Sequence, residues 1–181
     1  VRLLHGPLQL ESGLLEGLNS ERFGTAAELE QLLERHQASA AAVVMAAAVA
    51  DQRLQQPLSG KLSKQELQEV LHSPASWEMV PDLLHQMVQR RSADQVLMGF
   101  AAHSGDVLTQ AEAKFQRKGC DLLFANPIDQ PGVGFAASAN QGWLLSRGAS
   151  PEAMGPCSKL ALAHGLLDRL RLRLPQAARA D

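Results

Sequence analysis

The sequence predicts an α/β fold built on a mostly parallel sheet. Three short apolar runs have the length of buried strands, and segments with helical spacing lie between them; the runs cover residues 41–45, 96–100 and 121–125. Strands that alternate with helices are typical of parallel sheets, because a parallel crossover needs a connection long enough to hold a helix. With 181 residues, 45% of them hydrophobic, the chain is long enough to bury a core.

The N-terminal region predicts a strand followed by a capped helix. Residues 1–5 have the pattern of a strand, and because the chain opens within it we expect a further segment upstream of Val1. Thr25 and Glu28 have the spacing of a capping box, in which hydroxyl and carboxylate each satisfy a backbone amide at a helix start. Leucines at helical spacing then predict a helix over 26–36.

A flap is expected after the strand at 41–45. Residues 52–71 are rich in Gln and contain Pro57 and Gly60, which favours a long mobile loop with one short helix over 64–71. The remaining elements follow at clear intervals: strands over 76–80, 96–100, 121–125 and 143–145, a helix starting at Pro81, a helix over 107–118 between Asp106 and Gly119, a loop over 126–140, and a helix over 158–172. We expect residues 1–174 to form one domain and 175–181 a frayed tail.

Ligands of parallel α/β sheets bind at the carboxyl ends of the strands. Asp51, the pair Phe100–Ala101 and Asn126 are expected at such ends. Taken alone, Asp51 fits a turn residue as well as a ligand-binding one, and Phe100 fits a core position. His103 is interpreted as a loop residue, since no partner for catalysis can be assigned to it from the sequence.

Composition excludes several functions. The net charge is −2 and the pI about 6.3, so no global positive field attracts nucleic acid or an anionic membrane. Aromatic residues make up only 4%, which disfavours a stacking platform for single-stranded nucleic acid. The longest apolar stretch, 38–50, is too short to span a bilayer. Cys120 and Cys157 form neither a disulfide framework nor a zinc motif, so we expect a reduced cytoplasmic setting and no metal ligands.

Two pairs of lysines have both a plain and a functional interpretation. Lys114 and Lys118 are four residues apart on one predicted helix, so they share a side of it, either as an exposed face or as a phosphate-binding pair. Lys61 and Lys64 belong to the flap, either as ordinary surface residues or as part of a lid. The glycine pattern over 132–137 lacks the strand and helix of a dinucleotide site and is interpreted as an ordinary loop. These residues alone indicate a soluble α/β domain that binds an anionic small molecule.

Five motifs in order resemble one known family, phosphopantothenoylcysteine synthetase, which in bacteria is usually the C-terminal half of a bifunctional coenzyme A biosynthesis flavoprotein. The segments are AAAVAD ending at Asp51, KLSK starting at Lys61, VPDLL over 80–84, GFAA over 99–102 and KFQRKGCDLLFAN over 114–126. The resemblance runs from Val1 to about Leu172. It implies a Rossmann-like, doubly wound sheet with helices on both faces, plus the flap.

The resemblance also implies an activity. CTP would activate 4′-phosphopantothenate as an acyl-cytidylate with release of pyrophosphate, and the amine of cysteine would then displace CMP. Mg²⁺ is expected with the nucleotide, ATP is the alternative to CTP, and no FMN is expected because the flavin-binding half is absent. A homodimer formed through the flap region is implied, with no nucleic acid or membrane as partner.

Site residues follow from the same positions. Lys61 is expected to bind the triphosphate and to act in catalysis. The other nucleotide-binding positions are Asp51, Pro81, Asp82, Leu83, Leu84, Phe100, Lys114 and Lys118.

Departures from the family pattern leave two alternatives open. Ser63 replaces one cation of the flap motif, His103 stands where an acidic residue is usual, and Pro127 replaces the usual Asp. One alternative is a degenerate member that kept the fold as a nucleotide-binding or dimerisation module without catalysis. The other is an unrelated Rossmann-like protein.

Overall fold

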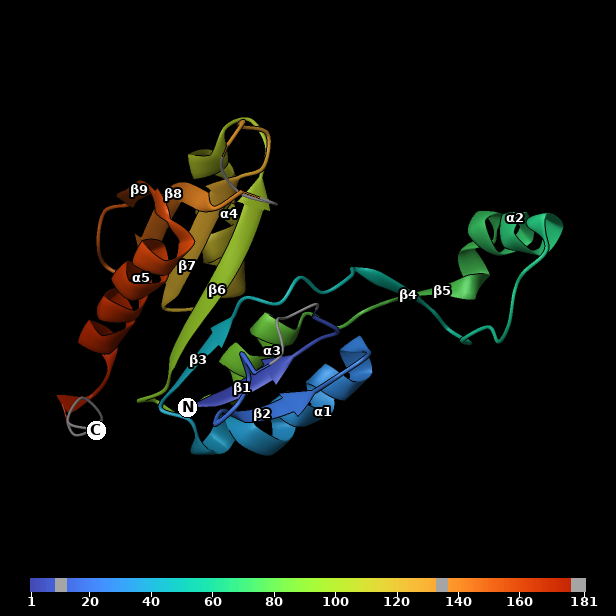
Figure 1. Cartoon of the computed structure of the whole chain (residues 1–181), viewed down its shortest axis with the longest axis horizontal. Helices are drawn as coiled ribbons and strands as arrows, with labels where there is room; N and C mark the ends of the chain where they lie inside the picture. The colour runs from blue at the N-terminus through green and yellow to red at the C-terminus, as the bar shows by residue number, and fades with distance from the viewer. Residues whose placement is uncertain (9–12, 133–136, 177–181) are drawn as a thin grey trace. The chain divides into compact units, whose positions relative to one another are not determined.

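The computed structural model describes residues 1–8, 13–132 and 137–176 (Figure 1). The chain divides into two compact units, of which the first comprises Val1–Glu30 with Ala48–Asp82 and the second Gln31–Ala47 with Leu83–Asp181. Most of the loop pattern at 132–137 and residues 177–181 of the predicted tail lie outside the described residues.

Two parallel strands open the first unit. Strand β1 (Arg2–His5) pairs with β2 (Asn19–Arg22) from Arg2↔Asn19 to His5↔Arg22. Helix α1 (Ala26–His36) follows with the predicted capping box, in which Glu28 N donates to Thr25 Oγ1 and Thr25 N donates to Glu28 Oε2, both at 3.2 Å. The sequence did not predict β2, because its four residues are all polar and carry no apolar alternation.

The flap is a two-stranded ribbon that carries a helix. Strand β4 (Gln52–Leu54) pairs antiparallel with β5 (Trp77–Met79), and α2 (Lys64–His72) with the short helix η2 (Pro74–Ser76) lies between them in the chain. Ser63 caps α2 through a reciprocal capping box with Glu66. The indole Nε1 of Trp77 donates to the Val70 carbonyl at 3.0 Å and holds α2 to the ribbon. The predicted loop therefore contains a strand, β4, that its Gln-rich sequence did not reveal.

A five-stranded mixed sheet organises the second unit. Its order is β3-β6-β7-β8-β9, and the first three strands are parallel while the last two run antiparallel to their neighbours. The strands are β3 (Ala42–Met45), β6 (Val96–His103), β7 (Leu122–Pro127), β8 (Ala139–Ser146) and β9 (Glu152–Ser158). The predicted α/β class with a mostly parallel sheet is confirmed.

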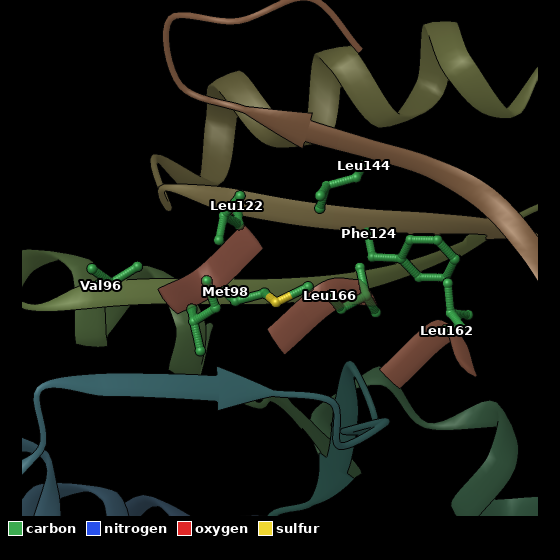
Figure 2. Close-up of a cluster of buried hydrophobic side chains, with 8 residues drawn as sticks. Val96, Met98, Leu122, Phe124, Leu144, Leu162 and Leu166 are labelled. Atoms are coloured by element: carbon green, nitrogen blue, oxygen red, sulfur yellow. The ribbon is translucent and has the colours of Figure 1, made fainter. Parts of the chain in front are cut away.

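Helices cover both faces of this sheet. On one face, α5 (Lys159–Arg173) buries leucines at four-residue intervals against β6, β7 and β8, as Figure 2 shows for Leu162 and Leu166 near Met98 and Phe124. On the other face lie α3 (Leu83–Arg90) and α4 (Val107–Lys118). Helix α4 has the predicted ends, since Asp106 accepts from Thr109 N and Gly119 closes the helix with φ of 71°.

Several predicted boundaries at the strand ends were wrong. Strand β6 continues to His103 and pairs with β7 up to His103↔Pro127, so Phe100 lies inside the strand rather than at its end. The apolar run stops at Phe100, but backbone pairing with β7 extends the strand beyond it. Asp51 is not at the end of β3, which stops at Met45, and instead directly precedes β4.

Strand β9 was missed for a physical reason. Its sequence contains Gly155 and Pro156, which usually mark turns, and Pro156 has no amide hydrogen to donate to a ladder. An edge strand tolerates both residues, and β9 is an edge of the sheet. Pro81 also differs from the prediction, because α3 starts two residues later, at Leu83. None of the helices within the described residues has the length and apolarity that crossing a membrane requires.

Gly142 tests the packing of β8 on β7. A Cβ at this position would lie 2.1 Å from the backbone oxygen of Ala125, which cannot move without breaking the sheet. Gly142→Ala should therefore lower the free energy of unfolding by about 1–3 kcal/mol, measured by urea denaturation. Gly165→Ala is the matched control, since its Cβ would meet only the flexible end of Met154 and the helix gains about 0.5–1 kcal/mol from Ala. Equal stability of Gly142→Ala and the unmodified chain would contradict the assigned register.

Trp77 tests how α2 is held to the ribbon. Trp77→Phe keeps an aromatic side chain, with a smaller ring, and removes the donor to the Val70 carbonyl, at a cost of at least about 1 kcal/mol. Amides of α2 should then exchange with deuterium about fivefold faster. Trp143→Phe in β8 is the control and should leave α2 unchanged. Unaltered exchange in Trp77→Phe would show that the indole does not secure the helix.

Candidate functional site

Three predicted site residues meet at the base of the flap ribbon. Val80 N donates to the Asp51 carbonyl at 2.9 Å, immediately beyond the last paired residues of β4 and β5. This bond places Asp51 beside the start of the segment Pro81–Asp82. The side chain of Asp51 is exposed. The sequence predicted a shared role for these residues, and the ribbon explains how positions 30 residues apart become neighbours.

Lys61 lies beyond the opposite end of the same ribbon. The pairing runs from Gln52↔Met79 to Leu54↔Trp77, so Asp51 marks one end, whereas Lys61 follows the other end in the connection to α2. Lys61 is exposed and precedes the helix cap at Ser63 by two residues. The fold of one chain therefore does not gather Lys61 and Asp51 at the same end of the flap.

Leu83 and Leu84 are core residues of the second unit. Their side chains are only 3% and 7% exposed. Leu84 covers Gly99 of β6, where an added Cβ would lie 2.5 Å from Leu84 Cδ2. Because these side chains are buried, only the backbone of Leu83 or Leu84 is available to contact a ligand.

Phe100 and the lysine pair lie on opposite faces of the sheet. The ring of Phe100 meets Phe124 edge to face at 5.7 Å and packs against the cluster that α5 covers. Lys114 and Lys118 belong to α4 on the other face. Helix α4 starts after the carboxyl end of β6 and runs back toward the start of β7, so the two lysines lie in the half of α4 that is farther from this edge. Parallel sheets bind ligands at the carboxyl edge.

The two lysines are half-buried rather than on the fully exposed side of α4. Val107 and Ala111 are the buried residues of this helix, and Lys114 and Lys118 continue their stripe at seven-residue intervals. Arg117, by contrast, is exposed. Half-burial strengthens the field of an ammonium group because less water screens it. This placement suits a phosphate-binding pair better than a plain exposed face.

His103 is a site residue that the sequence did not assign. It is the last residue of β6, and its Nε2 is buried without a hydrogen-bond partner among the described residues. Burial lowers the pKa of His103, the positive charge of Lys114 lowers this pKa further, and a side-chain hydrogen bond with Gln110 acts in the opposite direction. The sequence did contain a signal for this residue, namely a histidine near a predicted strand end followed by a lysine on the next predicted helix.

The loops after β6 and β7 are tied together at this edge. Ile128 N donates to the His103 carbonyl at 3.0 Å, and Gly105 N donates to Asp129 Oδ2 at 2.8 Å. Gln110 Nε2 reaches the Ser104 carbonyl at 2.6 Å. These bonds fix the backbone around His103, so the edge presents an imidazole and a nearby ammonium group in a constrained setting.

The described residues give little support for metal binding or for a reactive thiol. Within the part of the chain that the structure describes, no group of three His, Cys, Asp or Glu side chains is arranged to hold a metal ion. The thiol of Cys120 is buried, and burial raises its pKa to about 11, so it carries almost no thiolate at neutral pH.

The predicted site residues divide between the two units. Asp51, Lys61, Pro81 and Asp82 belong to the first unit. Leu83, Leu84, Phe100, Lys114 and Lys118 belong to the second. Their nucleotide-binding roles remain predictions.

Comparison with known proteins gives a consistent result. The family model "DNA/pantothenate metabolism flavoprotein C-terminal domain" matches residues 1–173. The "Coenzyme A biosynthesis bifunctional protein CoaBC" of Mycobacterium tuberculosis is 33% identical over 172 residues, covering 88% of this chain and 40% of that protein. The protein of the same name from Bacillus subtilis is 26% identical and is also covered to 40%. The chain thus spans about two fifths of the length of these relatives.

Solved structures show the same fold. The C-terminal domain of a coenzyme A biosynthesis bifunctional protein CoaBC superposes with a TM-score of 0.72 at 20% identity, covering 94% of this chain and 74% of that one. A Cab2 mutant in complex with phosphopantothenate-cysteine superposes with a TM-score of 0.61 at 14% identity, covering 87% and 54%. The match over nearly its whole length shows that the chain belongs to the DNA/pantothenate metabolism flavoprotein C-terminal domain family, which confirms the resemblance read from its sequence.

Proposed function

We propose that this chain is a phosphopantothenate–cysteine ligase domain that acts in coenzyme A biosynthesis and uses CTP. The observation that carries this proposal is the family match over residues 1–173, combined with the half-buried Lys114 and Lys118 on α4, the helix that follows the carboxyl edge of β6. A cytoplasmic location fits such an enzyme.

The proposed reaction has two steps. A carboxylate oxygen of 4′-phosphopantothenate attacks the α-phosphorus of CTP, which forms an acyl-cytidylate and releases pyrophosphate. The amine of cysteine then attacks the acyl carbon, forms the amide bond and expels CMP, while the amine loses a proton. Negative charge grows on the leaving pyrophosphate, and fixed cations stabilise it. Lys114 and Lys118 supply this charge in the proposal, and Phe100 lines the nucleotide from the other face.

Mg²⁺ enters the proposal with the nucleotide. It commonly binds through substrate phosphates and one or two carboxylates rather than in an all-protein cage. Asp51 and Asp82 are the carboxylates of the predicted site. We assign no step to a protein-held metal, and we expect no FMN on this chain.

A homodimer through the flap completes the proposal. Helix α2 exposes Leu67 and Leu71 to 45% and 57%, an apolar surface that a second copy would cover. Lys61 lies at the end of the ribbon away from Asp51. A flap that crosses to a second copy would bring its Lys61 to that copy's nucleotide, where it would bind the triphosphate.

Nucleotide binding is the first test. The chain should bind Mg-CTP, and Lys114→Ala should weaken this binding by about 10- to 100-fold, because a charged hydrogen bond of about 1.5–3 kcal/mol is lost. Isothermal titration calorimetry with Mg-CTP and Mg-ATP measures both affinity and nucleotide preference. Arg117→Ala is the matched control, since it removes an exposed charge from the same helix. Failure to bind either nucleotide would refute the nucleotide site and favour an unrelated role for the fold.

Turnover separates the ligase from a degenerate module. With CTP, 4′-phosphopantothenate and cysteine supplied, pyrophosphate and phosphopantothenoylcysteine should form, and Lys61→Ala should lower kcat/KM by at least about tenfold through loss of a charged contact. Lys64→Ala, three residues along the flap, is the control and should change the rate little. Tight CTP binding without any product would show that the chain is a non-catalytic nucleotide-binding or dimerisation module.

A further inference from the structure

The carboxyl edge of β6 holds the imidazole of His103, which has a side-chain hydrogen bond with Gln110. His103 Nε2 is buried and lacks a hydrogen-bond partner among residues 1–8, 13–132 and 137–176. A buried polar nitrogen without a hydrogen-bond partner is unfavourable, because it has lost its bonds to water. Buried polar atoms usually have a hydrogen-bond partner, so the unpartnered Nε2 of this half-buried residue has the chemistry of a group that can bind a ligand.

The positive charge of Lys114 indicates that such a ligand would be an anion. The ammonium group is close enough to act on His103 electrostatically, and it does so from α4, on the same face of the sheet as the imidazole. His103 ends β6 at the edge where parallel sheets bind ligands, and the charge of Lys114 acts on it from α4. A phosphate oxyanion would satisfy both, because it accepts from an ammonium group and from a protonated ring nitrogen.

Two carboxylates of the adjoining loops also carry charge near His103. Asp106 accepts from Thr109, and Asp129 accepts from Gly105 N. Strand β7 carries no charged residue along its pairing with β6. Strand β3 is also uncharged, and its pairing with β6 ends at Gly99, where α3 covers the strand through Leu84. After burial, the charge of Lys114 is the next cause that lowers the pKa of His103.

We propose that His103 belongs to the anion-binding group of this edge and takes up a proton when a phosphate group binds beside Lys114. In the free chain the ring is neutral at physiological pH, because burial and Lys114 both disfavour its charged form. A bound phosphate reverses the sign of the local field and stabilises the imidazolium. The inference rests on the proposed function in taking the nucleotide triphosphate as ligand, although the phosphate of 4′-phosphopantothenate has the same chemistry.

Proton uptake gives the binding a definite pH dependence. If the ligand raises the pKa of His103, the bound state holds more protons than the free state between the two values. Affinity must then increase as pH falls through that window, by at most tenfold per pH unit, and stay constant outside it. Without a titrating group at position 103, affinity for Mg-CTP should not follow this curve.

Nuclear magnetic resonance of ¹⁵N-labelled histidine tests the electrostatic pair directly. The His103 signal is assigned by its loss in His103→Asn and titrated from pH 5 to 8.5. It should titrate below the ordinary histidine range, and its pKa should rise in Lys114→Gln and on saturation with Mg-CTP. Arg117→Gln, which removes an exposed charge from α4, should leave it unchanged. A signal that moves in neither Lys114→Gln nor the complex would overturn the proposal.

Calorimetry supplies the second readout and separates the sources of phosphate. Mg-CTP, Mg-pyrophosphate and 4′-phosphopantothenate are titrated separately between pH 6 and 8.5, in buffers of different ionisation enthalpy that report proton uptake. The ligand that raises the pKa of His103 identifies the phosphate. Its affinity should lose the pH dependence in His103→Asn, whose cooperative unfolding confirms the fold. Binding that leaves His103 unmoved refutes this inference alone, whereas no binding by any ligand refutes it together with the proposed function.

Discussion

The parallel pairing of β6 with β7 is the constraint on which the candidate site depends. It runs without interruption from Met98↔Leu122 to His103↔Pro127. Because the pairing continues past the apolar run, Phe100 is held inside the strand and His103 becomes its last residue. The alternation of side chains along β6 then sends Phe100 toward α5 and His103 toward α4. One register thus determines which groups the two faces bring to the edge.

Close packing beneath this edge keeps the register fixed. Gly99 lets Leu84 of α3 approach the strand, and Gly142 lets β8 approach the backbone of Ala125. The base of the sheet is also secured, because Asp121 accepts from Leu97 N at 2.8 Å and pairs with Arg91. Burial of an ion pair is costly unless its members are also hydrogen-bonded. The carboxylate of Asp121 meets this condition, because it accepts from Leu97 N as well as from Arg91. Close packing in the body of the sheet fixes the backbone that positions His103 at its carboxyl edge.

Local sequence signals made much of the fold predictable, but they did not indicate which strands pair with one another. The capping box at Thr25, the cap at Asp106 and the left-handed Gly119 each express a rule that acts within a few residues, and each is present. Strands β2, β4 and β9 are polar, Gln-containing or interrupted by Gly155–Pro156, and they exist because a neighbouring strand pairs with them. For the same reason the sequence could name the lysines of α4 but could not place His103 beside Lys114. That proximity depends on how α4 returns over the sheet.

The flap ribbon constrains how the chain can act. In an antiparallel pair, the residue before the first strand and the residue after the second strand lie at the same end. The segment that connects the two strands lies beyond the other end. Asp51 and Val80 are these two residues, so the segment with Lys61 and α2 must lie beyond the far end. A catalytic role for Lys61 then requires a nucleotide supplied at that end, and the exposed Leu67 and Leu71 give a second copy an apolar surface to cover there. The geometry of one ribbon thereby links two proposals, catalysis by Lys61 and assembly through the flap, so that loss of the assembly should also remove catalysis by Lys61.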